Sequence, residues 1–163
     1  MQILILILGG LVLGGDQLLK YWISSNLTLG QTRTFMPGLL SLTHIRNTGA
    51  AWSSFEGQTW FFYIITIIAL AVILPLLVRA FRRHDSLVYF SGLVLVLAGT
   101  LGNFIDRARQ GYVVDMFQFE FINFPIFNIA DMALTFGVIL IFIYVLFLEK
   151  DEDPTENVQG RKK

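Results

Sequence analysis

Along the chain, long apolar stretches alternate with shorter polar segments. No charged residue occurs in residues 1–15, 57–78, 86–105 and 132–148. A helix that crosses the hydrocarbon core of a bilayer needs roughly 17 to 25 predominantly apolar residues. The pattern therefore predicts four transmembrane helices, and the fold class that it indicates is an all-α integral membrane protein.

The overall composition agrees with that class. Hydrophobic residues make up 55% of the chain and charged residues 15%, and the mean hydropathy is +0.64. A soluble domain has charged residues nearer a quarter. The formal net charge of zero argues against a nucleic-acid partner. The absence of cysteine excludes thiol proteases, thiolate metal sites and disulfide scaffolds.

The short loop 79–85 carries Arg79, Arg82 and Arg83, and cytoplasmic loops hold the excess of arginine and lysine. We therefore expect both termini in the cytoplasm and residues 23–58 and 107–127 outside. Residues 1–15 lack a basic start and a cleavage site of small residues, so we expect a retained first helix rather than a cleaved signal peptide. Residues 1–150 are expected to form a single transmembrane domain, and the polar residues 151–163 a disordered cytoplasmic tail.

In the two outer segments, apolar and polar residues alternate. The alternation covers residues 39–55 and 115–124. In the second segment it places Phe117, Phe119 and Phe121 on one face, and Gln118 and Glu120 on the other. The pattern predicts short strands at the membrane interface, which we expect to form a small extracytoplasmic β-strand cradle with its apolar face toward lipid or a lipid-like ligand. An aromatic belt is expected at the same level, formed by Trp22, Trp52 and Trp60.

Polar residues gather where the predicted helices meet the outer side. They are Asp16 and Lys20 on the first helix, Asn103, Asp106 and Arg107 on the third, and Asn128 and Asp131 on the fourth. An ionisable side chain at the centre of a membrane helix is unfavourable by about 2.5 to 3.5 kcal/mol on insertion scales. Such residues are candidates for function, and their convergence on one side strengthens that interpretation.

Two acids stand out, and each has an ordinary explanation. Asn128 and Asp131 have the spacing of a capping box, and an anion at a helix N-terminus is stabilised by the helix dipole. Asp115 taken alone indicates an exposed loop acid. Two carboxylates held together at one apolar boundary would instead share a proton. That is the condition for aspartic proteolysis, in which one carboxylate activates water and its protonated partner polarises the scissile carbonyl.

The polar residues around the two acids leave alternatives open. Asp16 and Lys20 are four residues apart, which suits a helical ion pair and equally a pair that orients or grips substrate. Asn47, Asn103 and Arg107 can donate hydrogen bonds to carboxylates or to a substrate backbone, although asparagine in a turn is often structural. Gly10 and Gly14 form a G-x-x-x-G pattern, which predicts helix packing.

Other catalytic chemistries find less support. The sequence contains no G-x-S-x-G motif, and a serine–lysine dyad would need Lys20 with Ser24 or Ser25. His44 and His84 are predicted on opposite sides of the membrane and match no H-E-x-x-H pattern. We therefore expect neither a metal nor another cofactor.

Five motifs resemble the successive conserved boxes of the bacterial lipoprotein signal peptidases, also called signal peptidase II. In chain order they are DQLLK (16–20), NTGAAWS (47–53), AGTLGNFIDR (98–107), VVDM (113–116) and FNIAD (127–131). The resemblance implies an aspartyl endopeptidase of the bacterial cytoplasmic membrane. Such enzymes cut the signal peptide from prolipoproteins just before a diacylglyceryl-modified cysteine. Met116 and Ala98 stand where the family usually has phenylalanine and glycine, and both are apolar replacements.

The resemblance also implies roles for individual residues. The catalytic pair would be Asp115 and Asp131, at the extracytoplasmic face. The substrate-binding or dyad-supporting residues would be Asp16, Lys20, Asn47, Asn103, Arg107 and Asn128. The expected partners are prolipoprotein substrates with a diacylglyceryl-cysteine, together with membrane lipids.

Two hypotheses from other classes remain. One is a small four-helix proton-coupled transporter that uses Asp16 as its intramembrane acid. The other is a structural or assembly protein whose acids only cap helices.

Overall fold

The computed structural model describes residues 1–49 and 58–149. Three predictions fall wholly or partly outside the described residues. They concern the place of Trp52, the strand pattern beyond residue 49, and the tail 151–163.

Within residues 1–49 and 58–149, four helices are long and apolar enough to cross a membrane, which confirms the predicted number. They are α1 (Gln2–Asn26), α2 (Thr59–Arg83), α3 (Leu87–Gln110) and α4 (Ile129–Ile143), the last continued by the π-helical turn η2 (Tyr144–Leu148). Large apolar side chains cover the outside of the bundle, as at Leu18 and Ile67. An apolar exterior of this kind is what a lipid environment requires.

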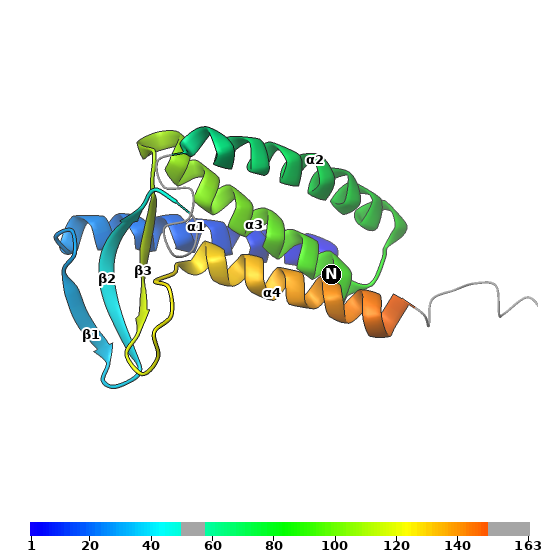
Figure 1. Cartoon of the computed structure of the whole chain (residues 1–163). Helices are drawn as coiled ribbons and strands as arrows, with labels where there is room; N and C mark the ends of the chain where they lie inside the picture. The colour runs from blue at the N-terminus through cyan, green and yellow to red at the C-terminus, as the bar shows by residue number, and fades with distance from the viewer. Residues whose placement is uncertain (50–57, 150–163) are drawn as a thin grey trace, which may run out of the picture.

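Helix α3 is the central element of the bundle. It lies between α2 and α4 and packs against α1 as well (Figure 1). Half of its most apolar stretch is buried, against 17% to 22% for the other helices that could span the membrane in the described chain. The site residues on α3 are therefore held by packing from several sides.

Glycines allow α3 and α4 to approach closely. A Cβ atom on Gly92 would lie 2.9 Å from the carbonyl oxygen of Gly137, and one on Gly137 would lie 2.8 Å from that of Gly92. The predicted packing role of Gly10 and Gly14 is wrong, because a Cβ at either position would meet no described atom within 4 Å. On α1 the close contact is made instead by Gly9, which faces Val94.

Helices α1 and α3 both extend beyond residues 23 and 107, where the outer segments were expected to begin. Helix α1 runs past Asp16 and Lys20 to Asn26, and α3 runs past Asp106 to Gln110. Gly111, with φ of 79°, then ends α3; this left-handed conformation is one that glycine adopts without strain. The charged residues therefore lie inside continuous helices, where their side chains need partners.

The predicted cradle is a small sheet at one end of the bundle. In the described residues it consists of β1 (Thr32–Met36), β2 (Leu40–Asn47) and β3 (Val113–Phe119), antiparallel and in the order β1-β2-β3. Strand β1 was not predicted, and β3 ends before Phe121. The sheet lies where α1 and α3 end and α4 begins (Figure 1).

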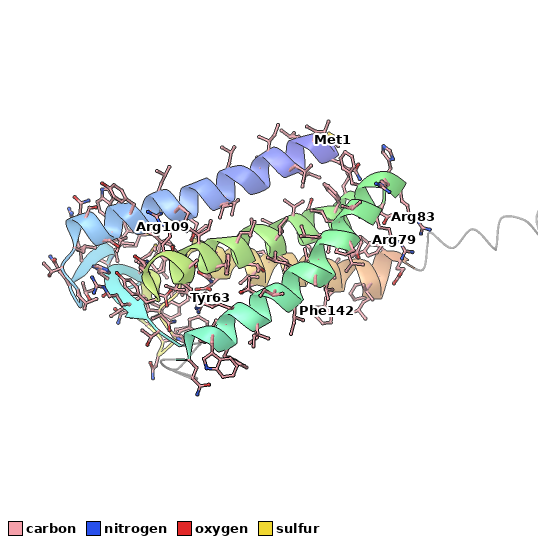
Figure 2. All side chains as sticks on the ribbon, turned by 90° about the horizontal axis from the view of Figure 1, so that it is seen from above. Met1, Tyr63, Arg79, Arg83, Arg109 and Phe142 are labelled. Atoms are coloured by element: carbon pink, nitrogen blue, oxygen red, sulfur yellow. The ribbon has the colours of Figure 1, made fainter. Side chains whose placement is uncertain are left out.

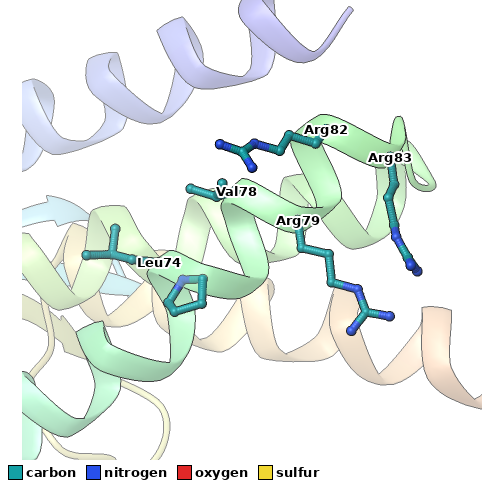
Figure 3. A pocket seen from close by; sticks show the side chains of 6 residues that line it. Leu74, Val78, Arg79, Arg82 and Arg83 are labelled. Atoms are coloured by element: carbon teal, nitrogen blue, oxygen red, sulfur yellow. The ribbon is translucent and has the colours of Figure 1, made fainter.

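Arginines mark the opposite end of the bundle. Figure 2 shows Arg79 and Arg83 at the end of α2, on the side of Met1, whereas Tyr63 and Arg109 lie near the sheet. A cavity of about 580 Å³ on α2 is lined by Leu74, Pro75, Val78, Arg79, Arg82 and Arg83 (Figure 3). The sheet and this cationic surface are thus separated by the length of the helices.

Candidate active site

The residues singled out from the sequence come together beneath the sheet. Asp115 lies in the middle of β3 and Asp131 in the first turn of α4. Both carboxylates line one cavity of about 940 Å³. Its polar wall also includes Asn47, Asn103 and Arg107, and its apolar wall includes Phe119, Phe124, Phe127, Leu134 and Phe136.

Asp131 is fixed by the start of α4. Asn128 has an extended backbone as N-cap, and its side-chain oxygen accepts the N–H of Asp131 at 2.9 Å. The Asp131 Oδ2 atom in turn accepts the N–H of Asn128 at 3.1 Å. These two bonds form the predicted capping box. The carboxylate of Asp131 therefore takes part in the capping box of α4 and also lines the cavity.

Asn128 also joins the two acids. Its Nδ2 atom donates to Asp115 Oδ1 at 2.7 Å, while its Oδ1 atom holds the backbone of Asp131. The Asn128 side chain is fully buried, so its hydrogen bonds are not exchanged with water. One amide therefore fixes the position of Asp115 relative to the first turn of α4.

Asn103 holds the second oxygen of Asp131. Its Nδ2 atom donates to Asp131 Oδ1 at 2.7 Å. Its Oδ1 atom accepts from Lys20 Nζ at 3.0 Å and from Asn128 Nδ2 at 3.1 Å. Because an ammonium group only donates, Lys20 determines which end of the Asn103 amide faces the carboxylate.

Asn47 holds the second oxygen of Asp115. Its Nδ2 atom donates to Asp115 Oδ2 at 2.8 Å, and its Oδ1 atom accepts the N–H of Gly49 at 2.9 Å. The second bond is typical of asparagine in a turn. The structural and the functional interpretations of Asn47 are therefore compatible.

The surroundings of Asp115 favour its protonated form. Burial raises the pKa of Asp115 most strongly, followed by the negative charge of Asp131, and the hydrogen bonds from Asn47 and Asn128 and the charge of Lys20 only partly offset this. The pKa rises from 3.8 to about 7. The carboxylate pair can therefore hold a proton near neutral pH.

Arg107 lies on the cavity wall beside the pair. Its Nη2 atom donates to the carbonyl oxygen of Gly49 at 3.1 Å, and its guanidinium stacks 4.2 Å from the centre of the Phe62 ring. It interacts electrostatically with Asp115 and Asp131. These contacts hold a cation in place on the lining of the cavity.

Asp16 and Lys20 lie behind the cavity. Their side chains are 1% and 3% exposed and form an ion pair of 2.9 Å. Neither is among the described residues that line the cavity. The two side chains thus face each other in the interior of the bundle.

Two further residues of this polar cluster were not assigned a role from the sequence. Asp106 accepts from Lys20 Nζ at 3.0 Å, and Gln17 donates to both Asp16 and Asp106. Asp106 stood out as a charged residue near the end of a membrane helix. Gln17 gave no such signal, because an uncharged side chain in the DQLLK segment has no obvious partner until α1 and α3 are packed together.

The fold and the carboxylate-lined cavity are those of an integral membrane protein with an internal polar site. Similarity to known proteins defines its class as a membrane peptidase. The family model described as signal peptidase (SPase) II matches residues 7–147. The chain therefore belongs to the signal peptidase II family.

Individual relatives agree with this family. A lipoprotein signal peptidase of Latilactobacillus sakei is 58% identical over 149 residues, which cover 91% of this chain and 97% of the relative. One of Enterococcus faecalis is 55% identical over 144 residues, 88% of each chain. A solved structure described as a bacterial membrane enzyme matches with a TM-score of 0.79 and 41% identity, covering 94% of this chain and 92% of the other.

Proposed function

We propose that this chain removes the signal peptide from prolipoproteins by aspartic proteolysis, with Asp115 and Asp131 as the catalytic pair. One observation carries the proposal: both carboxylates line a single cavity and are bridged by the side chain of Asn128. The membership of the signal peptidase II family and the lipoprotein signal peptidases among its relatives supply the substrate class.

The surroundings of the two acids suggest how they divide the work. Asp131 accepts a backbone N–H at the N-terminus of α4, where the helix dipole stabilises negative charge. Asp115, with its pKa of about 7, is the partner that carries the proton. In this division ionised Asp131 takes a proton from the attacking water. Protonated Asp115 polarises the scissile carbonyl.

The cavity suits a substrate that is part peptide and part lipid. Its lining offers the side-chain amides of Asn47 and Asn103 and the guanidinium of Arg107, together with several phenylalanines. A cysteine with a diacylglyceryl group keeps its acyl chains in the bilayer, so the bond before it lies near the membrane surface. We propose that the apolar wall receives the chains and that the bond before the cysteine reaches the carboxylates.

We propose that the cavity faces the extracytoplasmic side and that both termini are cytoplasmic. The arginines at the far end of α2 support this orientation, because positive charge accumulates in cytoplasmic loops. A reporter fused within residues 79–85 is expected to give a cytoplasmic signal. An external signal there would reverse the orientation.

The rival hypotheses find less support in the geometry. A proton-coupled transporter would need Asp16 in contact with its transport path. Asp16 is instead held by Lys20 and by the N–H of Ala130. A purely structural role fits the capping box of Asp131 but gives no reason for a second buried acid beside it.

The decisive test of function compares two forms of one precursor. Purified protein in detergent is incubated with a diacylglyceryl-modified prolipoprotein and with its unmodified twin. We expect cleavage before the cysteine in the modified form and at least tenfold slower cleavage of the twin, because the acyl chains contribute binding energy. Absence of cleavage in both forms would refute the proposed function, and equal cleavage of both would refute lipid recognition.

A further inference from the structure

The two proposed catalytic aspartates share a feature of their backbone. The residue before Asp115 is Val114, whose N–H donates to Asp106 Oδ2 at 3.2 Å. The residue before Asp131 is Ala130, whose N–H donates to Asp16 Oδ1 at 2.9 Å. Each of the two proposed catalytic acids is therefore preceded by a residue whose backbone N–H is bound by a buried carboxylate from another secondary-structure element.

The two holding carboxylates are joined to each other. Lys20 Nζ lies 2.9 Å from Asp16 Oδ2 and 3.0 Å from Asp106 Oδ2. Gln17 Nε2 donates to the same two carboxylates at 3.2 and 3.1 Å. We call Asp16, Gln17, Lys20 and Asp106 the brace. It connects α1 and α3 to the starts of both segments that present the catalytic acids.

The brace also reaches the acids by a second route. The third hydrogen bond of Lys20 goes to Asn103 Oδ1, and Asn103 donates to Asp131. Asp16, Lys20 and Asp106 are almost completely buried, and no member of the brace is among the described residues that line the cavity. The brace therefore acts on the acids from behind and does not touch the substrate.

The charges of the brace do not cancel. Two carboxylates surround one ammonium, which leaves one net negative charge behind the acids. A buried ion pair alone is weak evidence for stability. Lys20 lowers the pKa of Asp115, whereas a negative charge near the acids favours retention of their shared proton. This asymmetry suggests a role in the reaction beyond folding.

We propose that Asp106 is a positioning residue of the reaction. Together with Asp16 and through Lys20, it fixes the separation of Asp115 and Asp131 and places a negative charge behind them. This inference rests on the proposed aspartic mechanism. It adds Asp106 and Gln17 to the residues on which the rate depends, although neither contacts the substrate cavity.

The electrostatic consequence has a definite sign. Asp16 and Lys20 from α1 and Arg107 from α3 interact electrostatically with the acids, and Asp106 and Tyr63 interact with Arg107. Tyr63 also donates to the carbonyl oxygen of Arg107. Removal of a negative charge from the brace lowers the proton affinity of the pair, and removal of the positive charge raises it. The alkaline limb of the pH–rate profile reports this affinity.

The experiment measures kcat and KM against pH for the full chain in detergent, with a diacylglyceryl-modified precursor. In Asp106→Asn, the side-chain oxygen can still accept the Val114 N–H. We expect the alkaline limb to move to lower pH by about half to one pH unit, kcat to fall about tenfold or more, and KM to stay within about twofold. Lys20→Met is expected to move the limb to higher pH.

Two further variants separate charge from geometry. The double variant Lys20→Met/Asp106→Asn restores one net negative charge, so its limb should return to the wild-type position while kcat stays low. Gln17→Met removes hydrogen bonds without changing a charge, so its limb should not move. This variant also preserves both ion pairs of Lys20, so of the four variants it should disturb folding least.

Failure of the inference and failure of the proposed function are distinguishable. If wild-type protein cleaves the precursor but Asp106→Asn and Lys20→Met leave the limb in place or move it in the same direction, the brace is only structural and the inference is wrong. A raised KM at unchanged kcat in Asp106→Asn would also contradict it. If wild-type protein does not cleave the precursor at all, the proposed function itself fails.

Discussion

Asn128 donates its side-chain N–H to Asp115 over 2.7 Å, across a sequence separation of 13 residues. The same side chain caps α4 through the N–H of Asp131. Strand β3 and helix α4 are thereby fixed to each other at the positions of the two acids. Several measurable consequences follow from this bridge.

Asn128→Ser separates the two tasks of Asn128. Serine caps helices about as well as asparagine, but its short side chain cannot also reach Asp115. Because Asn128 is fully buried, loss of its amide leaves buried acceptors unpaired, so we expect a loss of about 1 to 3 kcal/mol of stability and a fall in kcat of about 100-fold. Asn128→Ala is the matched variant, which should lose the activity and about 1 kcal/mol more of stability than Asn128→Ser. Full activity in Asn128→Ser would show that the bridge is dispensable.

Asp115→Asn should make the protein more stable at neutral and alkaline pH. The pKa of Asp115 is raised in the folded state, from 3.8 to about 7. The favourable contribution of its protonated form is therefore complete below about pH 4 and is lost as the pH rises to about 7. The stabilisation by Asp115→Asn should grow across that range and reach a few kcal/mol, since a tenfold change in proton affinity corresponds to about 1.4 kcal/mol.

Thermal unfolding of wild type and Asp115→Asn in the same detergent, at about pH 4 and about pH 8, measures this difference. An equal difference in melting temperature at both pH values would mean that Asp115 is not held in its protonated form by burial.

The rate of the wild-type enzyme should fall on the alkaline side of about pH 7. In the proposed mechanism the pair needs one shared proton, and burial raises the pKa of Asp115 to about 7. Because the pair titrates jointly, the limb belongs to both acids. A profile of kcat/KM against pH in one detergent gives the value. A rate that is constant from about pH 6 to about pH 9 would contradict a shared proton.

The contact between α3 and α4 predicts an asymmetry among the glycines. In Gly92→Ala the new methyl group would meet the carbonyl oxygen of Gly137 at 2.9 Å, and backbone cannot move aside as a flexible side chain can. We expect a loss of about 1 to 3 kcal/mol. Gly10→Ala is the control, because its Cβ faces open space and alanine favours the helix. Equal effects on thermal stability would argue against this packing.

The sequence predicted the helices well because a long run without charge has few alternatives to a membrane span. The ends of α1 and α3 were harder to predict. Asp16, Lys20 and Asp106 interrupt the apolar runs, yet they remain inside the helices because they pair with one another. A single sequence gives no direct sign that such charges will find partners.

The sheet was predicted in part for a related reason. Strand β3 overlaps the segment in which apolar and polar residues alternate, and its Phe117 and Phe119 side chains pack against Phe127. Strand β1 (Thr32–Met36) is exposed at all its positions, so no buried face imposes a pattern on it. Its pairing with β2 becomes evident only in three dimensions.

The sequence predicted which residues belong to the candidate site, but it did not predict how their side chains are arranged. The polar character of Asp115, Asp131 and Asn128 could be read directly from the sequence. The orientation of the Asn103 amide could not, because it depends on Lys20 from another helix. The hydrogen bond between Val114 and Asp106 likewise depends on β3 returning across the end of α3.

The most direct test of the catalytic pair is single-turnover cleavage of a diacylglyceryl-modified precursor by Asp115→Asn and Asp131→Asn. Asp85→Asn, in the turn between α2 and α3 at the far end of the bundle, is the matched control. We predict that the two site variants insert and fold but cleave at least about 1,000-fold more slowly than wild type, while Asp85→Asn cleaves normally. Cleavage at the wild-type rate by either site variant would contradict the proposed pair.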